Sequence, residues 1–316
     1  MKAIVQEKYG APTEVLSLRE LEAPKPRDDE VLVKVRGASV NQADWLLVTG
    51  TPKIARLGFG LFKPKQRVPG RDLAGTVEAI GSEVTCFKPG DEVFGEADGG
   101  TFAEYACVSE KLLARKPNNL GFEDAAAIPL AGVTALQGLR DHGQLESGQH
   151  ILINGASGGV GSFAVTVAKA LGAEVTAVCS TNNVATAEKL GADRIIDYTR
   201  ESFTDIDQCY DLIFDIAASQ PLASCRQILK PGGRFVSSAG AISSVFKVAL
   251  ASLVKGWVVG PWMARTNPDD LIVLKELAEQ GKLVPAIAER VELGDVPRAV
   301  ERQGKGHARG KTVIRV

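Results

Sequence analysis

A glycine-rich segment, with a strand pattern before it and a helix pattern after it, constrains the fold of this chain most. It reads Asn154-Gly155-Ala156-Ser157-Gly158-Gly159-Val160-Gly161. Residues 150–154 have the composition of a short buried strand, and apolar residues recur at helical spacing over 162–171. Glycine lets the backbone turn sharply and approach a pyrophosphate, and the next helix begins with unpaired N–H groups. The segment predicts a dinucleotide-binding turn; the alternative is an ordinary strand-to-helix turn that uses glycine.

Length and composition fit a globular protein of two domains, because the chain has 316 residues, of which 45% are hydrophobic and 24% are charged. A net charge of −1 predicts no general attraction to nucleic acid or to acidic membranes. The five cysteines are scattered and form no Cys-x-x-Cys pair, which predicts a reduced, cytoplasmic protein. The charged N-terminus is unlike a signal peptide. Lys247 and Lys255 interrupt the apolar stretch 244–262, so we expect a packed helix there and not a membrane span.

The first 123 residues are mostly of strand type, with turn signals between the strands. The expected strands cover 31–35, 74–80, 92–94 and 102–108. Short strands in such a series are typical of a barrel or sandwich. Residues 51–68 contain glycines, prolines and several cations, and we expect a long, functional loop with some helix that shapes the acceptor pocket.

After residue 123 the pattern changes to alternating helices and strands. A helix is expected over 123–139, interrupted near Pro129 and Gly132. Lys230 to Gly233 predicts a helix stop before a strand. The expected strands are 150–154, 174–179, 194–197, 210–216 and 233–238, and the expected helices are 161–171, 184–190 and 220–229. This alternation predicts right-handed βαβ units and a parallel sheet covered on both faces. A helix from 267 to 280 and a strand from 311 to 316 follow.

Ordered motifs extend along nearly the whole chain. They are Ala38-Ser39-Val40-Asn41, Pro69-Gly70-Arg71-Asp72-Leu73-Ala74-Gly75, Lys88-Pro89-Gly90-Asp91, Gly132-Val133-Thr134-Ala135, the Gly155–Gly161 segment, Gly191-Ala192-Asp193, Lys230-Pro231-Gly232-Gly233 and Gly306-His307-Ala308-Arg309-Gly310-Lys311. In these motifs the sequence resembles the medium-chain dehydrogenase/reductase superfamily, in its zinc-independent quinone oxidoreductase branch.

The resemblance implies an α/β fold with three parts. A GroES-like β-rich catalytic domain would cover residues 1–123, and a Rossmann domain with a doubly wound parallel sheet would cover 124–265. Residues 266–316 would return to the catalytic domain. The resemblance also implies an active site in the cleft between the domains, NADPH as cofactor, hydride transfer to a small quinone or enone, and a homodimer.

We expect no metal. In the zinc-dependent members of the family, the three catalytic ligand positions correspond by motif to Asn41, Arg71 and Leu130 of this chain. An amide, a guanidinium and an alkyl group cannot supply the thiolate and imidazole ligands that zinc prefers.

The segment after the second expected strand favours NADPH over NADH. An NAD site usually has an acidic residue there, which binds the ribose 2′-hydroxyl. Here the strand runs into Ser180, Thr181, Asn182 and Asn183, with no carboxylate to repel a 2′-phosphate and with four polar side chains that can donate to it. Related sequences often carry a cation in this loop, and this chain has none.

The resemblance adds further cofactor-binding positions. They are Thr134, Gly155, Ser157, Gly158, Gly159, Val160, Tyr198, Ala217, Gly240 and Lys311. Tyr198 would lie near the adenosine and its phosphate; the alternative is a half-exposed tyrosine after a strand. Lys311 would meet the pyrophosphate; the alternative is a solvated strand lysine.

Asn41 and Arg71 are the candidate catalytic residues. A quinone or enone gains negative charge on oxygen as hydride arrives, and donors placed at that oxygen would stabilise it. The alternatives are a turn-stabilising amide for Asn41, and for Arg71 a structural ion pair with Asp44 or Asp72. Since no side-chain acid is evident, we expect the final proton to come from water.

Two alternatives to a quinone reductase stay open. One is a reductase of α,β-unsaturated carbonyls such as alkenals and enones. The other is a non-catalytic NADPH-binding protein, because no indispensable catalytic residue is identifiable. Consumption of NADPH with a panel of acceptors would separate these alternatives.

Overall fold

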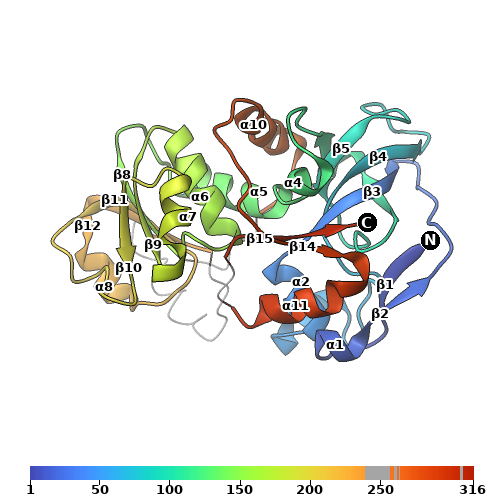
Figure 1. Cartoon of the computed structure of the whole chain (residues 1–316), viewed down its shortest axis with the longest axis horizontal. Coiled ribbons are helices and arrows are strands. Elements are labelled where there is room, and N and C mark those ends of the chain that lie inside the picture. The colour runs from blue at the N-terminus through green and yellow to red at the C-terminus, as the bar shows by residue number, and fades with distance from the viewer. Residues whose placement is uncertain (239–256, 260–261, 263, 307–308) are drawn as a thin grey trace. The chain divides into compact units, whose positions relative to one another are not determined.

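The computed structural model describes residues 1–238, 257–259, 262, 264–306 and 309–316 (Figure 1). These residues form two compact units. The first unit contains Met1–Ala131, Thr266–Glu279 and Ile287–Val316. The second unit contains Gly132–Arg265 and Gln280–Ala286. Among the described residues, no helix is both long enough and apolar enough to span a bilayer.

A seven-stranded sheet organises the first unit, with the strand order β14-β15-β3-β4-β5-β7 and with β6 paired to β3. Pairs are antiparallel except β14 and β15, which are parallel. The strands are β3 (Glu30–Val40), β4 (Asp72–Ile80), β5 (Glu92–Glu96), β6 (Tyr105–Ser109), β7 (Leu113–Arg115), β14 (Ile287–Glu292) and β15 (Lys311–Arg315). A separate two-stranded sheet contains β1 (Lys2–Gln6) and β2 (Leu16–Glu20).

Strand β3 shows why this sequence forms a one-sided sheet. Val31, Val33 and Val35 alternate into the core of the first unit, while Lys34 and Arg36 are exposed. Such alternation is typical of an antiparallel sheet with one face in water. The four strands predicted in this region are confirmed, although the fourth begins at Tyr105 and not at residue 102.

The helices of the first unit are short. They are α1 (Pro12–Val15), α2 (Gln42–Thr49), η1 (Lys53–Ala55), α3 (Arg56–Phe59), η2 (Glu110–Leu112), α4 (Phe122–Ala126), α10 (Pro268–Glu279), η6 (Leu293–Asp295) and α11 (Val296–Gly304). Helix α4 packs on β3 and β4 through Ala125 and Ala126, which are fully buried. The first unit therefore continues past the boundary predicted after residue 123.

The second unit contains a six-stranded parallel sheet with the order β10-β9-β8-β11-β12-β13. Its strands are β8 (His150–Asn154), β9 (Glu174–Cys179), β10 (Arg194–Asp197), β11 (Tyr210–Asp215), β12 (Leu229–Ser237) and β13 (Trp257–Val259). Numbered along the chain, this is the order 3-2-1-4-5-6 of the Rossmann fold. The order reverses between β8 and β11, which makes the ends of these two strands the expected place for a dinucleotide.

Helices cover the parallel sheet. They are α6 (Gly159–Ala170), η4 (Thr181–Asn183), α7 (Val184–Lys189) and α8 (Leu222–Gln227), together with the end of α5 (Pro129–Gln137) and the π-helical turn η3 (Gly138–His142). Helices α6 and α7 lie over one face of the sheet (Figure 1) and pack on β8, β9 and β10. Because β8 is covered on both faces, four of its five residues are buried, which explains its nearly continuous apolar sequence.

Three local predictions need correction. The helix predicted over 123–139 is interrupted at Pro129, as expected, but Gly132 lies inside α5 and does not break it. Strand β12 begins at Leu229, so residues 230–233 belong to the strand and are not a separate stop before it. The apolar stretch 244–262 was predicted as a helix, and most of it lies outside the described residues. Trp257–Val259 forms a strand that pairs with β12, because a short apolar run has no period that separates helix from strand.

Candidate functional site

The glycine segment of the second unit forms the predicted strand–turn–helix. Gly155 has a φ of +90°, which favours glycine, and its N–H donates to the Val178 carbonyl at 3.2 Å. A Cβ at Gly161 would lie 2.0 Å from the Gly155 carbonyl oxygen, so Gly161 allows the helix to pack against the turn. The fold therefore requires glycine at both of these positions.

Gly158 is different, because the fold itself does not require glycine there. Its φ is −77°, and the nearest atom to a Cβ would be the Gly155 carbonyl oxygen at 3.5 Å, an ordinary contact. Gly158 precedes α6, whose first-turn N–H groups, including those of Gly159 and Val160, have no acceptor one turn earlier in the helix. Open space in front of such a helix start fits an anionic group such as a pyrophosphate.

A hydrogen-bonded pair joins the ends of β8 and β11, where the strand order reverses. Asn154 Nδ2 donates to Asp215 Oδ1 at 2.8 Å and to Ser219 Oγ at 3.0 Å. The Ala218 N–H donates to the same carboxylate oxygen at 2.9 Å, and burial raises the pKa of Asp215. Ala217 lies beside Gly155, since a Cβ there would be 3.3 Å from the Ala217 Cβ. The sequence did not lead us to predict the Asn154–Asp215 pair. Both are polar residues at the carboxyl end of a buried strand, and this shared position is the signal that could have indicated the pair.

The loop after β9 contacts the glycine segment through Asn183. This residue is buried, and its Nδ2 lies 3.0 Å from Ser157 Oγ and 3.1 Å from Ser180 Oγ. Asn182 is exposed and, within the described residues, its side chain makes no hydrogen bond. The structure thus brings Ser157, Ser180 and Asn183 together and leaves Asn182 facing solvent.

A carboxylate does lie next to this loop, contrary to the sequence prediction. Thr181 Oγ1 donates to Asp197 Oδ2 at 2.5 Å, and Asp197 pairs in register with Cys179 at the ends of β10 and β9. The Thr181 hydrogen bond holds the pKa of Asp197 below its usual value. Arg200 lies 3.4 Å from the carboxylate and offsets its charge. The sequence pattern could not show this, because residues 179 and 197 meet only through sheet register.

The other predicted cofactor residues occupy varied positions. Tyr198 is 51% exposed, which leaves its ring free on the surface at the end of β10. Thr134 is half-buried within α5. Gly240 lies outside the described residues. The roles of these residues in cofactor binding stay predictions.

Strand ends of the first unit assemble a buried polar cluster around Asp72, which is fully buried. Its carboxylate accepts from Asn41 Nδ2 at 2.8 Å, from Ser39 Oγ at 2.7 Å and from Lys311 Nζ at 3.2 Å. The Leu130 N–H donates to its other oxygen at 3.0 Å. Lys311 Nζ also donates to Asn41 Oδ1. The cluster brings together strands β3, β4 and β15, which are far apart in sequence.

Lys311 is therefore not a solvated strand lysine, since its side chain is only 2% exposed. Its ammonium already has two acceptors in the first unit, and one of its three donor protons is left for another partner. Asn41 likewise uses its amide within the cluster, because the Nδ2 group donates to Asp72 and the oxygen accepts from Lys311. One Nδ2 proton of Asn41 is left over.

Arg71 pairs with Glu96, and not with Asp44 or Asp72 as the alternative prediction held. Arg71 Nε and Nη2 both lie 2.7 Å from Glu96 Oε1, and Thr266 Oγ1 donates to the other carboxylate oxygen. A guanidinium has five N–H donors, so this pairing leaves most of them available. The local sequence gave no sign of Glu96, which reaches Arg71 because β4 and β5 are adjacent.

Asp44 is buried completely at the start of α2. Its Oδ2 accepts the Asn41 N–H at 2.7 Å, while its Oδ1 has no partner among the described residues. Burial raises the pKa of Asp44 to about 7, an effect that the Asn41 hydrogen bond opposes. This carboxyl group therefore titrates near neutral pH.

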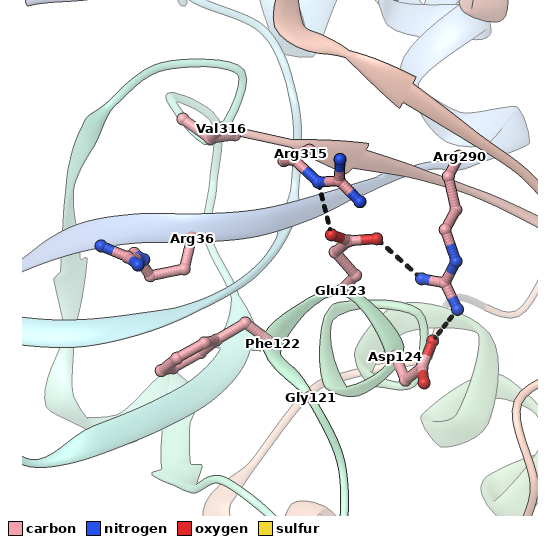
Figure 2. Close-up of a pocket in the computed structure, with 8 residues that line it drawn as sticks. All are labelled: Arg36, Gly121, Phe122, Glu123, Asp124, Arg290, Arg315 and Val316. Atoms are coloured by element: carbon pink, nitrogen blue, oxygen red, sulfur yellow. Dashed lines mark hydrogen bonds and ion pairs between the residues drawn. The ribbon is translucent and has the colours of Figure 1, made fainter.

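A surface pocket of about 540 Å³ lies elsewhere on the first unit. Figure 2 shows Glu123 between Arg315 and Arg290, with Arg290 also reaching Asp124. These pairs neutralise one another, and no ion pair of Arg36 is found within the described residues. No residue predicted for the functional site lines this pocket.

Comparison with known proteins agrees with this geometry. Residues 27–118 match the alcohol dehydrogenase GroES-like domain, and residues 190–314 match the family described as zinc-binding dehydrogenase. A 2-methylene-furan-3-one reductase from Solanum lycopersicum is 35% identical, over 99% of this chain and 79% of that protein. The chain belongs to the medium-chain dehydrogenase/reductase superfamily. It falls in the zinc-independent quinone oxidoreductase branch, and it is an oxidoreductase with a GroES-like and a Rossmann domain.

Other members of the superfamily also align with this chain over nearly all of its residues. The chloroplastic quinone-oxidoreductase QR1 of Triphysaria versicolor is 33% identical, over 99% of this chain and 98% of that protein. The structure of the quinone oxidoreductase from Coxiella burnetii superimposes with a TM-score of 0.88 at 32% identity, over 100% of this chain and 99% of that one. The chloroplastic NADPH-dependent alkenal/one oxidoreductase of Arabidopsis thaliana is 34% identical, over 99% of this chain and 79% of that protein.

The zinc in the family description does not match the residues of this chain. Asn41, Arg71 and Leu130, which the motif match predicts at the positions of the catalytic ligands, supply no thiolate or imidazole. Across the described parts of both units, no three His, Cys, Asp or Glu side chains lie together in a group that could hold a metal ion.

Proposed function

We propose that this protein is an NADPH-dependent quinone reductase that works without zinc. The observation that carries the proposal is the open helix start behind Gly158, located where the parallel sheet reverses its strand order. Names of relatives in the same branch, such as quinone-oxidoreductase QR1 and NADPH-dependent alkenal/one oxidoreductase, support the reaction class and the cofactor.

The second unit binds the cofactor. The backbone of residues 155–160 holds the pyrophosphate, and Ser180, Thr181, Asn182 and Asn183 lie toward the 2′-phosphate. Other residues of this unit, Thr134, Tyr198, Ala217 and Gly240, complete the cofactor site. Lys311, which belongs to the first unit, is the further residue proposed to meet the pyrophosphate. The bound nicotinamide supplies a hydride, and this chain supplies binding, orientation and charge.

The first unit handles the charge that develops on the acceptor. As hydride reaches a quinone, an oxygen becomes anionic, and N–H donors held in place stabilise it. Arg71 has unused guanidinium N–H groups, and Glu96 fixes its orientation through two short contacts. Asn41 has one unused amide proton and is held by Asp72 and Lys311. Water supplies the final proton.

Reduction of an activated C=C bond is the second candidate. The two relatives at 34% and 35% identity are named as an alkenal/one oxidoreductase and a 2-methylene-furan-3-one reductase. Both acceptor classes place negative charge on an oxygen conjugated to the carbon that receives hydride, so the same donors serve either one.

A panel of acceptors tests the proposal. We expect NADPH oxidation, followed by nicotinamide absorbance, to be faster with naphthoquinones or ortho-quinones than with alkenals, and slowest with simple ketones. A simple ketone needs a strong Lewis acid or proton donor, and the two proposed catalytic side chains, Asn41 and Arg71, supply neither. Faster turnover of alkenals would favour the second candidate, and rapid reduction of a simple ketone with inert quinones would contradict both. NADPH binding without turnover of any acceptor would indicate a non-catalytic protein.

A cytoplasmic location and a homodimer remain predictions.

A further inference from the structure

Large apolar side chains are concentrated on one exposed segment of the first unit, residues 51–68. Of the ten large hydrophobic residues that are exposed in the described structure, five lie between positions 54 and 62. They are Ile54, Leu57, Phe59, Leu61 and Phe62. Phe62 is 89% exposed and Leu57 is 71% exposed, so packing against the described residues does not explain them. Single exposed apolar residues are ordinary, whereas a cluster of them indicates an interaction surface.

Local structure holds these side chains close together. Helices η1 and α3 are consecutive, and Ile54 and Leu57, three residues apart, share a face of this helical stretch. The Lys65 N–H then donates to the Phe59 carbonyl at 2.9 Å, which closes a short loop that contains Leu61 and Phe62. The exposed apolar groups therefore form one compact patch and are not spread along an extended chain.

The same segment is strongly basic. Among its eighteen residues there are five cations and no acid. The cations are Lys53, Arg56, Lys63, Lys65 and Arg67. Within the described residues only Arg67 has an acidic partner, Glu7 at 3.6 Å, and both side chains are more than half exposed. Four cations of the segment thus have no acidic partner among the described residues, although the whole chain has a net charge of −1. Of these four, Arg56 lies over the Tyr9 ring and donates to the Gly50 carbonyl, which leaves the three lysines as the free cations nearest the apolar residues in sequence, at positions 53, 63 and 65.

We infer that residues 51–68 dock on the surface of an anionic lipid bilayer. Exposed aliphatic and aromatic groups gain free energy when they enter the boundary between head groups and acyl chains, and neighbouring lysines gain from anionic head groups. Nucleic acid would satisfy the cations but would leave the aliphatic side chains in water. A second copy of this chain would bring two patches of the same positive charge together, which is unfavourable. This inference departs from the expectation of no membrane contact, which was based on the net charge of the whole chain.

Co-sedimentation of the full chain with vesicles tests the inference. Vesicles of phosphatidylcholine alone are compared with vesicles that contain phosphatidylglycerol, at low and at high salt. We expect binding to the anionic vesicles only, with a loss at high salt because the attraction is screened. Replacing two lysines, as Lys63→Gln with Lys65→Gln, should weaken binding about thirtyfold, from the contribution of each cation near an anionic surface.

An apolar variant and a matched control complete the design. Leu57→Ser with Phe62→Ser should abolish vesicle binding. The matched control, Lys282→Gln with Val284→Ser, removes an exposed cation and an exposed apolar group elsewhere and should change nothing. Equal loss in the control pair, or no binding of the parent chain to anionic vesicles, would overturn the inference.

Release of the chain from vesicles by inorganic phosphate at constant ionic strength would also overturn the inference, because it would indicate a phosphate site. Self-association of the parent chain that is lost in the apolar variant, without vesicle binding, would instead show a second copy as the partner.

Discussion

The glycine segment of the second unit and the Asp72 cluster of the first unit are built in opposite ways. The glycine segment uses backbone atoms from eight consecutive residues. Its proposed chemistry depends on glycines, whose lack of a side chain leaves room for a phosphate group beside the backbone. The Asp72 cluster uses side chains from positions 39, 41, 72 and 311, and its chemistry depends on charges that are buried. The first kind of site tolerates little added volume, and the second tolerates little change in charge.

The largest effect is expected from adding volume to the glycine segment. Gly158→Val should abolish measurable NADPH binding while the protein stays folded, because a side chain there meets no protein atom closely but occupies the space in front of α6. Nucleotide titration by fluorescence or calorimetry measures this. Gly294→Val, at another glycine with free space, is the matched control and should bind normally. Normal binding by the Gly158 variant would show that the pyrophosphate lies elsewhere.

Removing the negative charge of Asp72 from the buried cluster should lower the stability of the folded protein. Asp72→Asn leaves the buried Lys311 ammonium without its counter-charge, and we expect a loss of about 3–5 kcal/mol in the free energy of unfolding of the first unit. Denaturant unfolding measures the loss. Glu7→Gln breaks the exposed ion pairs with Arg19 and Arg67 and should cost at most about 1 kcal/mol. An equal loss in the free energy of unfolding for the two variants would mean that the Asp72–Lys311 pair is as exposed to water as the surface pairs of Glu7.

Asp44, which lies beside the Asp72 cluster, should make the stability of the folded chain depend on pH. Its pKa is about 7 in the folded chain and about 3.9 when unfolded, so between these values the folded state binds more protons. Stability from this group should therefore fall as the pH rises from 4 through 7, by no more than about 4 kcal/mol. Asp72, Arg71 and Lys311 are the other charges that act on it.

Asp44→Asn is the variant that isolates this effect. Thermal midpoints at pH 5 and pH 8 should differ less in the variant than in the parent chain, because the amide does not titrate. Other carboxylates contribute to the pH dependence of both proteins equally, so the comparison removes them. An unchanged difference between the two midpoints would show that Asp44 stays ionised in the folded state.

The smallest effect is expected at the exposed edge of the cofactor site. Asn182→Arg adds a charged fork suited to phosphate oxygens, in a loop where solvent screens the gain. We expect NADPH to bind at most about tenfold more tightly, corresponding to about 1 kcal/mol, and NADH to be nearly unaffected. The gain should shrink as salt is added. Equal effects on both nucleotides, or a preference of the parent chain for NADH, would place the 2′-phosphate elsewhere.

The sequence by itself determined the parts of this protein that depend on neighbouring residues. The turn at residues 154–161 and the strands at 150–154, 174–179 and 194–197 follow from local composition, and their bounds were predicted correctly. Such elements form because backbone conformation and apolar periodicity act over a few residues. The series of motifs likewise placed the chain in its family.

Only the tertiary structure decided which polar groups meet. Arg71 reaches Glu96 across two adjacent strands, Thr181 reaches Asp197 through sheet register, and Lys311 reaches Asp72 over more than two hundred residues of sequence. No local pattern encodes these partners, because register and strand order are set by the packing of the whole unit. The exposure of the five large apolar residues between positions 54 and 62 is of the same kind, since the sequence shows apolar residues but only the fold shows that the described residues leave them uncovered.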